Sequence, residues 1–276
     1  MVELNPMMIT GIFVFIFGSL IGSFLNVCIH RLPLGESVIN PPSHCPKCGK
    51  PISWHDNIPI LSYLFLAGRC RFCREKISAR YFVVEFLTAL VFLFFYSRFG
   101  LGYNFFFYII FACGLIVATF VDIRERIIPD EISLGGAVCG FILSSLKGVR
   151  LTPFSFTPSH LLGSLYGIIA GAGIIYLSGF IFDLAYFKIL KKPAVDGETS
   201  SMGGGDVKLM AMVGAFLGWE KAILVFFLAP FFGLFFGIAN LLVKKEHVIP
   251  YGPFLSLAAL LSIFWADKVI ALILLR

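Results

Sequence analysis

The hydrophobic and polar positions of this chain fall into long apolar runs separated by short polar stretches. Within each run the apolar residues are continuous and do not alternate with polar ones, so the pattern predicts α-helices and not the strands of a β-barrel. A helix that crosses the hydrocarbon core of a bilayer needs about 17–25 residues. Eight runs approach or reach this length: Met7–Ile29, Tyr81–Ser97, Asn104–Val121, Ile132–Leu146, Leu161–Phe182, Val207–Trp219, Ala222–Val243 and Phe254–Leu275. The pattern therefore predicts an all-α, polytopic membrane bundle of about eight transmembrane helices.

Two of the predicted spans, Ile132–Leu146 and Val207–Trp219, are short for a bilayer, and we expect them to tilt or to start below the membrane surface. The first run has no basic segment before it and no clear cleavage site after it, so we interpret it as a retained helix and not as a signal peptide. Only one polar insertion has appreciable size. It divides the chain into a first transmembrane helix (residues 1–29), a small insertion (30–80) and a membrane bundle (81–276).

Composition and charge support the assignment to a membrane. The chain is 58% hydrophobic and only 14% charged, whereas a soluble domain carries about 25% charged residues. The formal net charge is +6, but most of the Lys and Arg residues lie in the loops after the first, third, fifth and seventh predicted helices. This distribution is typical of membrane topology, so we expect the lipid bilayer as a partner and no nucleic acid. The positive-inside rule places these four loops in the cytoplasm and both chain termini outside.

Two CxxC motifs mark the insertion as a candidate metal site. Cys45 and Cys48 form one pair, Cys70 and Cys73 form the other, and the spacer is slightly longer than the usual range of about 15–20 residues. Each motif can present two thiolates in a tight turn, and Gly49 and the neighbouring basic residues suit such a turn and a lowered thiol pKa. Four thiolates complete a tetrahedral shell, so the sequence predicts a structural Zn²⁺ site, with a redox-active pair as the alternative. The other cysteines lie in apolar helices and are interpreted as small buried hydrophobes: Cys28, Cys113 and Cys139.

Two acidic residues lie at the edges of apolar runs. Asp122 directly follows one run, and Asp206 follows the glycines Gly203, Gly204 and Gly205 at the start of another. An ionisable group close to bilayer depth is costly and usually functional. Two neighbouring carboxylates drive their pKa values apart, so that one activates water while the other donates a proton to a carbonyl oxygen. We expect the glycines to give the backbone conformational freedom and space for a substrate strand, and the pattern favours an intramembrane aspartyl protease.

The order of these motifs resembles that of a known family. The segment Gly203-Gly-Gly-Asp206 fits the GxGD signature of intramembrane aspartyl proteases, and Met202–Gly214 is similar to the corresponding stretch of type IV prepilin peptidases. The similarity also covers residues 22–33, 80–85, 122–130 and 250–254, together with the double CxxC. It extends over nearly the whole chain with the motifs in the family's order. The sequence is therefore identified as a member of the type IV prepilin peptidase family.

The resemblance implies a bifunctional enzyme of type IV pilus or type II secretion systems. Such enzymes cut the basic leader from prepilins or pseudopilins at the cytoplasmic face of the bacterial inner membrane, and then N-methylate the new N-terminal residue with S-adenosylmethionine. The resemblance implies that Asp122 and Asp206 are catalytic, with Gly203, Gly205 and Lys208 supporting the catalytic loop. Lys208 either holds an aspartate ionised or reaches the interface. The metal-binding insertion accompanies the methylating members, and no oligomeric state is implied.

Further polar residues lie near helix ends. Glu85 lies one turn into its helix, and we expect it to pair with Arg80 or to face a polar cavity used for methyl transfer. Asn26 and Arg31 resemble family positions and are candidates for the same methyl-transfer or substrate site, with ordinary polar contacts as the alternative. Asp130 follows a proline and precedes an apolar run, so we expect it to cap the next helix. It is also the alternative first carboxylate of the acidic pair.

Other functional classes are compatible with parts of the pattern. A peptidase without methylation is the close alternative to the bifunctional enzyme, and the sequence does not separate the two, because the insertion contains no glycine-rich nucleotide loop after a strand. A transporter would use the intramembrane carboxylates as a cation or proton relay, but no repeated halves are visible. A membrane scaffold would recruit partners through the zinc module and would tolerate replacement of both aspartates. Taken singly, Asp122 and Asp206 are also consistent with helix N-caps.

Overall fold

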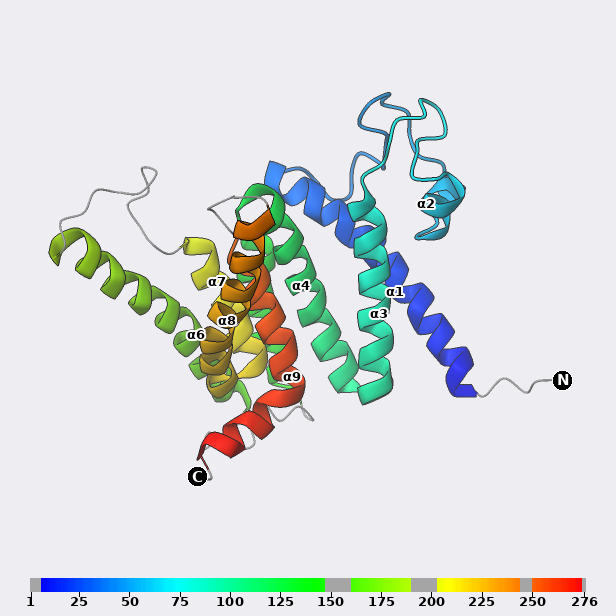
Figure 1. Ribbon diagram of the computed structural model, residues 1–276. Helices are drawn as coiled ribbons and strands as arrows, with labels where there is room; N and C mark the ends of the chain where they lie inside the picture. The colour runs from blue at the N-terminus through cyan, green and yellow to red at the C-terminus, as the bar shows by residue number, and fades with distance from the viewer. Residues whose placement is uncertain (1–5, 147–159, 190–202, 244–249, 275–276) are drawn as a thin grey trace. The chain divides into compact units, whose positions relative to one another are not determined.

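The structure, a computed structural model, is predominantly helical (Figure 1). It describes residues 6–146, 160–189, 203–243 and 250–274. The α-helices are α1 (Pro6–Arg31), α2 (Leu61–Phe65), α3 (Ala79–Phe99), α4 (Tyr103–Glu125), α5 (Asp130–Ser144), α6 (His160–Asp183), α7 (Gly204–Leu217), α8 (Trp219–Val243) and α9 (Gly252–Leu274). The shorter helical turns are η1 (Leu32–Leu34), η2 (Trp54–Asn57) and η3 (Leu184–Ile189). The described residues contain isolated β-bridges but no named strand, which confirms the all-α prediction.

All eight predicted helices form, but they are not all long enough to cross a bilayer. The stretches that are long and apolar enough number six within the described residues: Met7–Leu34, Ala79–Phe99, Tyr103–Glu125, His160–Tyr186, Trp219–Ile238 and Gly252–Leu272. Helix α5 has 15 residues and α7 has 14, so each is about 21–23 Å long against a hydrocarbon core of about 30 Å. The multi-pass membrane bundle is confirmed, whereas the count of about eight spans is not.

The chain forms two compact units, Met1–Val117 and Ala118–Arg276. The first unit contains α1, α3, most of α4 and the insertion that connects α1 to α3. Helix α1 packs along α3, and edge-to-face aromatic pairs such as Phe17 with Phe92, 6.1 Å between ring centroids, lie in this contact. The division into three parts that the sequence suggests stays a prediction.

Helix α7 is the most enclosed element of the second unit. It packs against α5, α6, α8 and α9, and every residue from Leu209 to Leu217 is buried. A helix that is apolar on all sides must be covered on all sides. The neighbouring helices provide this cover. Helix α7 can therefore be apolar around its whole circumference although it is too short to cross a bilayer.

Two glycines bring α6 and α7 into backbone contact. Gly167 of α6 lies against the carbonyl group of Gly214 in α7, and Gly214 lies equally close to the carbonyl group of Gly167. A Cβ atom built on either glycine would fall well inside van der Waals distance of the opposite backbone. Small residues at such crossings let membrane helices approach closely. The helix that carries Asp206 is therefore held in place through a contact that only glycine permits.

We expect Gly167→Ala to destabilise the protein by about 1–3 kcal/mol, because the added methyl group meets rigid main chain and overpacking costs this much. Gly173→Ala is the matched control on the same helix, since a Cβ at Gly173 meets nothing within 4 Å. Thermal unfolding in detergent should show a lower midpoint for Gly167→Ala only. Equal midpoints for the two variants would contradict the close packing of α6 and α7.

Candidate active site and metal centre

Two carboxyl groups lie together in the second unit. Asp122 is in the last turn of α4, and Asp206 is the third residue of α7. Asp122 is buried, and Asp206 is half-buried. The Asp122 carboxylate is close enough to act on Asp206 electrostatically. Two acids that lie far apart in the sequence are thus brought together as an acidic pair.

A backbone amide from a third helix holds one of these acids. The N–H group of Gly252 donates a hydrogen bond to Oδ2 of Asp122, with an N–O distance of 2.8 Å. Gly252 is the first residue of α9, so the positive end of this helix dipole faces the carboxylate. A Cβ atom on Gly252 would lie 2.7 Å from the same oxygen. A larger residue would therefore displace the Asp122 carboxylate or lengthen its hydrogen bond.

The environment of Asp206 favours a proton. Burial, together with the nearby Asp122 carboxylate, raises the pKa of Asp206 to about 7. Burial and the neighbouring Asp206 also raise the pKa of Tyr251 to about 12, which places this phenol near the pair, in the turn before α9. Burial and a neighbouring negative charge both favour the protonated form of a carboxyl group, so Asp206 keeps its proton more readily than an exposed aspartate does. The pair can therefore offer an ionised and a protonated carboxyl group at the same time.

Neither acid of the pair is a helix N-cap. Asp122 lies at the C-terminal end of α4, where the helix dipole disfavours a negative charge. The N-cap of α7 is Gly203, and the N-cap of α5 is Pro129. The prediction that Asp130 caps α5 is wrong, because the proline takes the cap position and Asp130 is the first helical residue. The Asp130 carboxylate instead forms an ion pair with Lys208 at 2.6 Å, so this lysine is bound to Asp130 and not to the acidic pair.

The glycines before Asp206 provide space and not an unusual backbone. Gly203 has φ −66° and ψ 135°, which any residue can adopt. A Cβ on Gly203 would lie 3.3 Å from Oδ2 of Asp206, and one on Gly205 would lie 3.2 Å from Cβ of Ile128. The described backbone thus does not use the expected conformational freedom at Gly203. A side chain at Gly203 or Gly205 would crowd the Asp206 carboxyl group or Ile128, whereas a Cβ at Gly204 would meet nothing within 4 Å.

The four cysteines of the CxxC motifs converge on one point. Their Sγ atoms all lie within 4.8 Å of one another, and those of Cys45 and Cys73 are 3.8 Å apart. A tetrahedral ion with metal–sulfur bonds of about 2.3 Å places its sulfur atoms about 3.8 Å apart. The four thiols are free and form no disulfide. This four-cysteine cluster therefore has the donor set and the spacing of a tetrahedral zinc site.

Each CxxC motif is closed by the same backbone hydrogen bond. The N–H of Gly49 donates to the carbonyl of Cys45 at 2.9 Å, and the N–H of Arg74 donates to the carbonyl of Cys70 at 3.0 Å. Both donors have positive φ values, 68° for Gly49 and 59° for Arg74. The backbone N–H of Cys73 is the main cause that lowers the pKa of the Cys70 thiol to about 7. Main-chain hydrogen bonds are the largest causes of this shift and the thiols of Cys73 and Cys45 add to it, whereas the expected basic residues do not contribute.

Asn26 and Arg31 bind main-chain carbonyl groups in the first unit. Arg31 is buried and donates to the carbonyls of Ser37, at 2.9 Å, and Pro41, at 2.6 Å. Its guanidinium thereby fixes the start of the insertion against the end of α1. Asn26 donates from Nδ2 to the carbonyl of Tyr81 at 3.0 Å, and its Oδ1 is buried without a hydrogen-bond partner among the described residues.

Glu85 is buried in α3 and binds the insertion. Its Oε2 accepts a hydrogen bond from the N–H of Ile60 at 2.8 Å, and the Ser23 side chain also hydrogen-bonds to it. The expected pairing with Arg80 is replaced by these contacts, since the Arg80 guanidinium lies over the ring of Tyr81, 5.3 Å from its centroid. A role of Glu85, Asn26 or Arg31 in methyl transfer stays a prediction.

The sequence pattern does not identify Gly252 and Tyr251 as residues of the acidic site. Both lie in the segment 250–254, where Pro250 and Pro253 flank the start of an apolar run. This composition indicates a tight helix start. Nothing in the local pattern indicates that the turn meets Asp122, because that contact depends on how α4 and α9 pack.

An acidic pair in a multi-pass helical bundle, together with a four-cysteine cluster, defines a class of polytopic membrane proteins with a carboxyl site. The chain belongs to the type IV leader peptidase family. Residues 109–238 match the family described as "Type IV leader peptidase family", and residues 16–99 match "Bacterial Peptidase A24 N-terminal domain". The acidic pair falls in the first match, and the four-cysteine cluster falls in the second.

Relatives from different bacteria are similar along most of their length. The chain is 33% identical to "Prepilin leader peptidase/N-methyltransferase" of Aeromonas hydrophila, covering 93% of this chain and 91% of the relative. It is also 33% identical to the protein of the same name from Bacillus subtilis (strain 168), covering 93% and 95%. With the corresponding protein of Pseudomonas putida, the identity is 30% and the coverage is 93% and 91%. No solved structure matches the chain.

Proposed function

We propose that this protein removes the leader peptide of type IV prepilins or pseudopilins and N-methylates the new N-terminal residue, at the cytoplasmic face of the bacterial inner membrane. The observation that supports the peptidase activity is the acidic pair, in which Asp206 is half-buried and lies close enough to Asp122 for that carboxylate to act on it. The names of the similar proteins support both activities. Basic residues are concentrated in the insertion after α1 and at the end of α4, two places that three candidate spans put on the same side, and this supports a cytoplasmic site.

Hydrolysis follows from the two protonation states of the pair. The ionised carboxyl group removes a proton from water, and the resulting oxygen nucleophile attacks the scissile carbonyl carbon. The protonated carboxyl group donates its proton to the carbonyl oxygen, which gives a neutral tetrahedral intermediate. When the carbon–nitrogen bond breaks, the proton taken from water passes to the leaving amine, and a hydroxyl proton of the intermediate returns to the pair. The Gly252 amide holds the Asp122 carboxylate in place throughout.

The substrate class suits a site at the membrane surface. A prepilin joins a basic leader to an apolar helix, so the helix can lie in the bilayer while the leader stays in water. Asp122 lies at the end of a candidate membrane span, Tyr103–Glu125, and is therefore close to the level where leader and helix meet. Cleavage at that junction requires a carboxyl pair at this depth, which an ordinary soluble protease does not have.

The insertion would hold a structural zinc ion through Cys45, Cys48, Cys70 and Cys73. Four sulfur donors leave no open position for water, so the ion would stabilise the loop and would not hydrolyse peptides. The methyl donor would be S-adenosylmethionine, which the family resemblance implies and the names of the relatives support. Asn26 is the candidate residue with a buried oxygen still open for a ligand. Arg31 and Glu85 already bind main-chain groups of the insertion.

The experiment combines purified full-length protein in detergent with a prepilin and S-adenosylmethionine, and it follows the mass of the product. Cleavage with an added methyl group would support both activities. Cleavage without it, while an authentic bifunctional relative methylates the same product, would restrict the proposal to a peptidase. No cleavage of any prepilin, with zinc bound and the fold intact, would remove the peptidase and favour a transporter or a scaffold.

We expect cleavage to be lost as the pH rises above about 7. The raised pKa keeps a proton on the pair below that value, and this proton is the one donated to the carbonyl oxygen. At low pH the second carboxyl group also becomes protonated, the base disappears, and kcat/KM should again fall. The pH dependence of kcat/KM should therefore be bell-shaped with a basic limb near neutrality. A flat profile far into the alkaline range, with the protein still folded, would contradict a shared proton.

A further inference from the structure

The insertion presents large apolar side chains that no helix of the first unit covers. Trp54 in η2 is 83% exposed, and Phe65 in α2 is 86% exposed. Leu61 and Leu64 in α2 are also exposed. These four side chains lie within the stretch Trp54–Phe65, which we call the interface segment. A concentration of exposed apolar side chains on a short segment indicates a surface that contacts an apolar partner.

Two contacts fix α2 beside a membrane-spanning helix. The Ile60 N–H is bound by Glu85 at 2.8 Å, and the ring of Tyr63 packs on the ring of Phe82, 5.5 Å between centroids. Phe82 and Glu85 belong to the candidate span Ala79–Phe99. Glu85 is six residues past the start of this span, so it lies about 9 Å along the helix axis at 1.5 Å per residue. The start of α2 therefore lies beside the first two turns of a helix that is long and apolar enough to cross a bilayer.

The backbone conformation of Ile60 indicates that surrounding contacts hold the start of α2 in place. Ile60 has φ 65°, a value that is unfavourable for a β-branched residue. Such a conformation persists only where the surroundings stabilise it. Here the carboxylate of Glu85 binds the Ile60 amide from a buried position in α3. The protein thus uses a buried acid to hold the beginning of α2 against the span.

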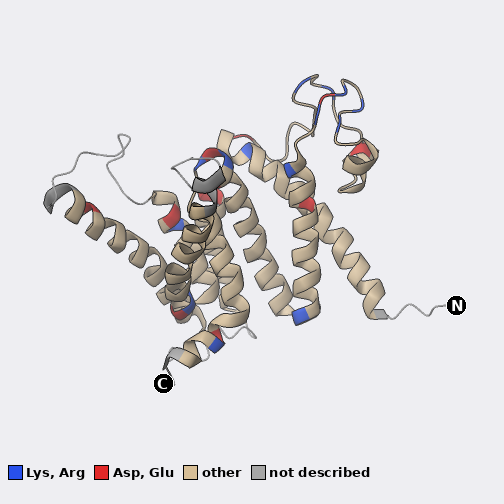
Figure 2. Ribbon diagram, in the orientation of Figure 1, with Lys and Arg blue, Asp and Glu red and all other residues tan. Residues whose placement is uncertain are grey.

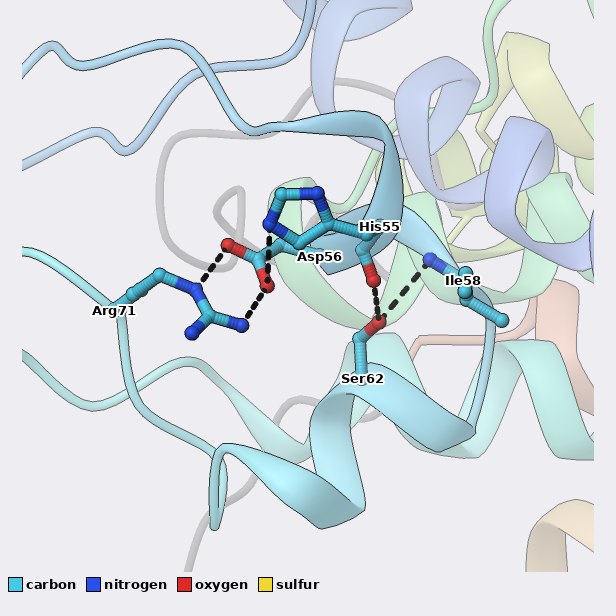
Figure 3. A network of polar contacts seen from close by, with 5 residues as sticks. All are labelled: His55, Asp56, Ile58, Ser62 and Arg71. Carbon is cyan, nitrogen blue, oxygen red and sulfur yellow. Dashed lines mark hydrogen bonds and ion pairs between the residues drawn. The ribbon is translucent and has the colours of Figure 1, made fainter.

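A second set of contacts joins the interface segment to Arg71, a residue of the second CxxC motif (Figure 3). Arg71, which lies between Cys70 and Cys73, donates from Nε to Oδ2 of Asp56 in η2 at 2.7 Å. Ser62 of α2 donates to the carbonyl of His55 at 3.0 Å. Arg71, within the second CxxC motif, therefore holds η2 through Asp56, and η2 in turn holds α2 through His55. Both ends of the interface segment are held, so its apolar side chains stay outward in one fixed arrangement.

The insertion as a whole carries an excess of positive charge. Residues 30–80 contain eight Lys and Arg residues and three Asp and Glu residues. Figure 2 shows that Lys and Arg are frequent along its loops, whereas α1 and α3 are mostly uncharged. A basic surface beside exposed Trp, Phe and Leu side chains is typical of segments that lie in the interface of a membrane with anionic lipids.

We propose that the interface segment is a membrane anchor: Trp54, Leu61, Leu64 and Phe65 insert at the boundary between headgroups and acyl chains, and the basic loops of the insertion face anionic headgroups. The occupant of this surface is lipid, because the segment is held beside the first turns of a candidate membrane span and carries exposed apolar side chains next to basic loops. An apolar substrate helix is a different occupant, and the experiment separates the two. This inference does not depend on the proposed catalytic activity.

The experiment measures the lipid contact of a tryptophan placed at the exposed end of α2. Phe65→Trp is prepared in the zinc-loaded full chain and reconstituted in nanodiscs of phosphatidylcholine and phosphatidylglycerol. Its fluorescence is compared with that of the parent protein in lipids brominated near the headgroup end of the acyl chain. Ile39→Trp is the control, because Ile39 is equally exposed but lies in the insertion before the first CxxC motif.

Most of the fluorescence added by Phe65→Trp should be lost in brominated lipid and should resist iodide in water. The fluorescence added by Ile39→Trp should show the opposite behaviour. Iodide quenching of Phe65→Trp without lipid quenching would overturn the proposal, and so would equal lipid quenching at both positions. Protection of Phe65→Trp only after a prepilin is added would assign the surface to the substrate helix instead. Leu64→Trp repeats the measurement if Phe65→Trp does not fold.

Discussion

Replacing either Asp122 or Asp206 with Asn should lower the rate of leader cleavage by at least about 10²-fold, because each replacement removes a general acid or base. The protein should still fold. The amide introduced by Asp122→Asn keeps an oxygen that can accept the Gly252 hydrogen bond. Because Asn has nearly the same size and shape as Asp, the substitution leaves the surrounding apolar packing unchanged. Product mass measured at saturating prepilin gives kcat for each variant. The double variant should be no slower than the slower single variant, since the two groups act as one unit.

Asp130→Asn is the matched control for these variants. Asp130 is an exposed acid in the same unit, and its ion pair with Lys208 is of the surface kind that contributes about 0–1 kcal/mol. Cleavage by this variant should stay close to that of the parent protein. If Asp130→Asn abolished cleavage while Asp122→Asn retained it, Asp130 would be the first carboxylate and the acidic pair would be wrongly assigned.

The helices could be predicted because lipid imposes a simple rule on sequence. Continuous apolar runs mark the position of every helix from α3 to α9. The predicted helix ends are less accurate, because polar residues at the ends of a helix are not part of the apolar run. Asp122 is an example. The apolar run ends before it, so the pattern places it after the helix, yet α4 continues to Glu125. Backbone hydrogen bonds of a helix do not require an apolar side chain, and the last turn at the membrane surface is free to be polar.

Helix α2 could not be predicted from the same rule. The stretch from Ile58 to Leu66 is apolar, but it is much too short to span and it is surrounded by basic residues and cysteines. The pattern therefore includes it in a polar insertion. Its structure depends on contacts with α3, in particular those of Ile60 and Tyr63. A short segment that lies against another element carries no periodic signal of its own.

The candidate site was predictable in its chemistry and not in its geometry. The spacing of two CxxC motifs is a local property, so the four-cysteine cluster followed directly from the sequence. The acidic pair required a resemblance to rank Asp122 above Asp130, since both follow the same apolar run. The Gly252 amide escaped prediction because a backbone donor has no sequence signature. Its position is set by the packing of α9 against the end of α4.

Cys45→Ser should abolish zinc binding and unfold the insertion without unfolding the membrane helices. A tetrahedral site with three sulfur ligands and a weak hydroxyl loses most of its affinity, and structural zinc contributes about 10–16 kcal/mol to small folded modules at neutral pH. Elemental analysis should give one zinc ion per parent chain and almost none per variant chain. Limited proteolysis should then cut within residues 36–78, which the parent protein should resist.

Cys139→Ala is the control, since Cys139 lies in α5 of the other unit and belongs to no cluster of possible metal ligands among the described residues. This variant should keep its zinc and its resistance to protease. The Cys45→Ser variant also tests how the insertion is braced. Arg71 lies between two of the ligands and holds Asp56, so loss of zinc should release the interface segment and expose a tryptophan at position 65 to iodide. If the parent protein were isolated without metal and with disulfides between the motifs, the cluster would be a redox site, because closely spaced thiols that bind no cation are free to oxidise.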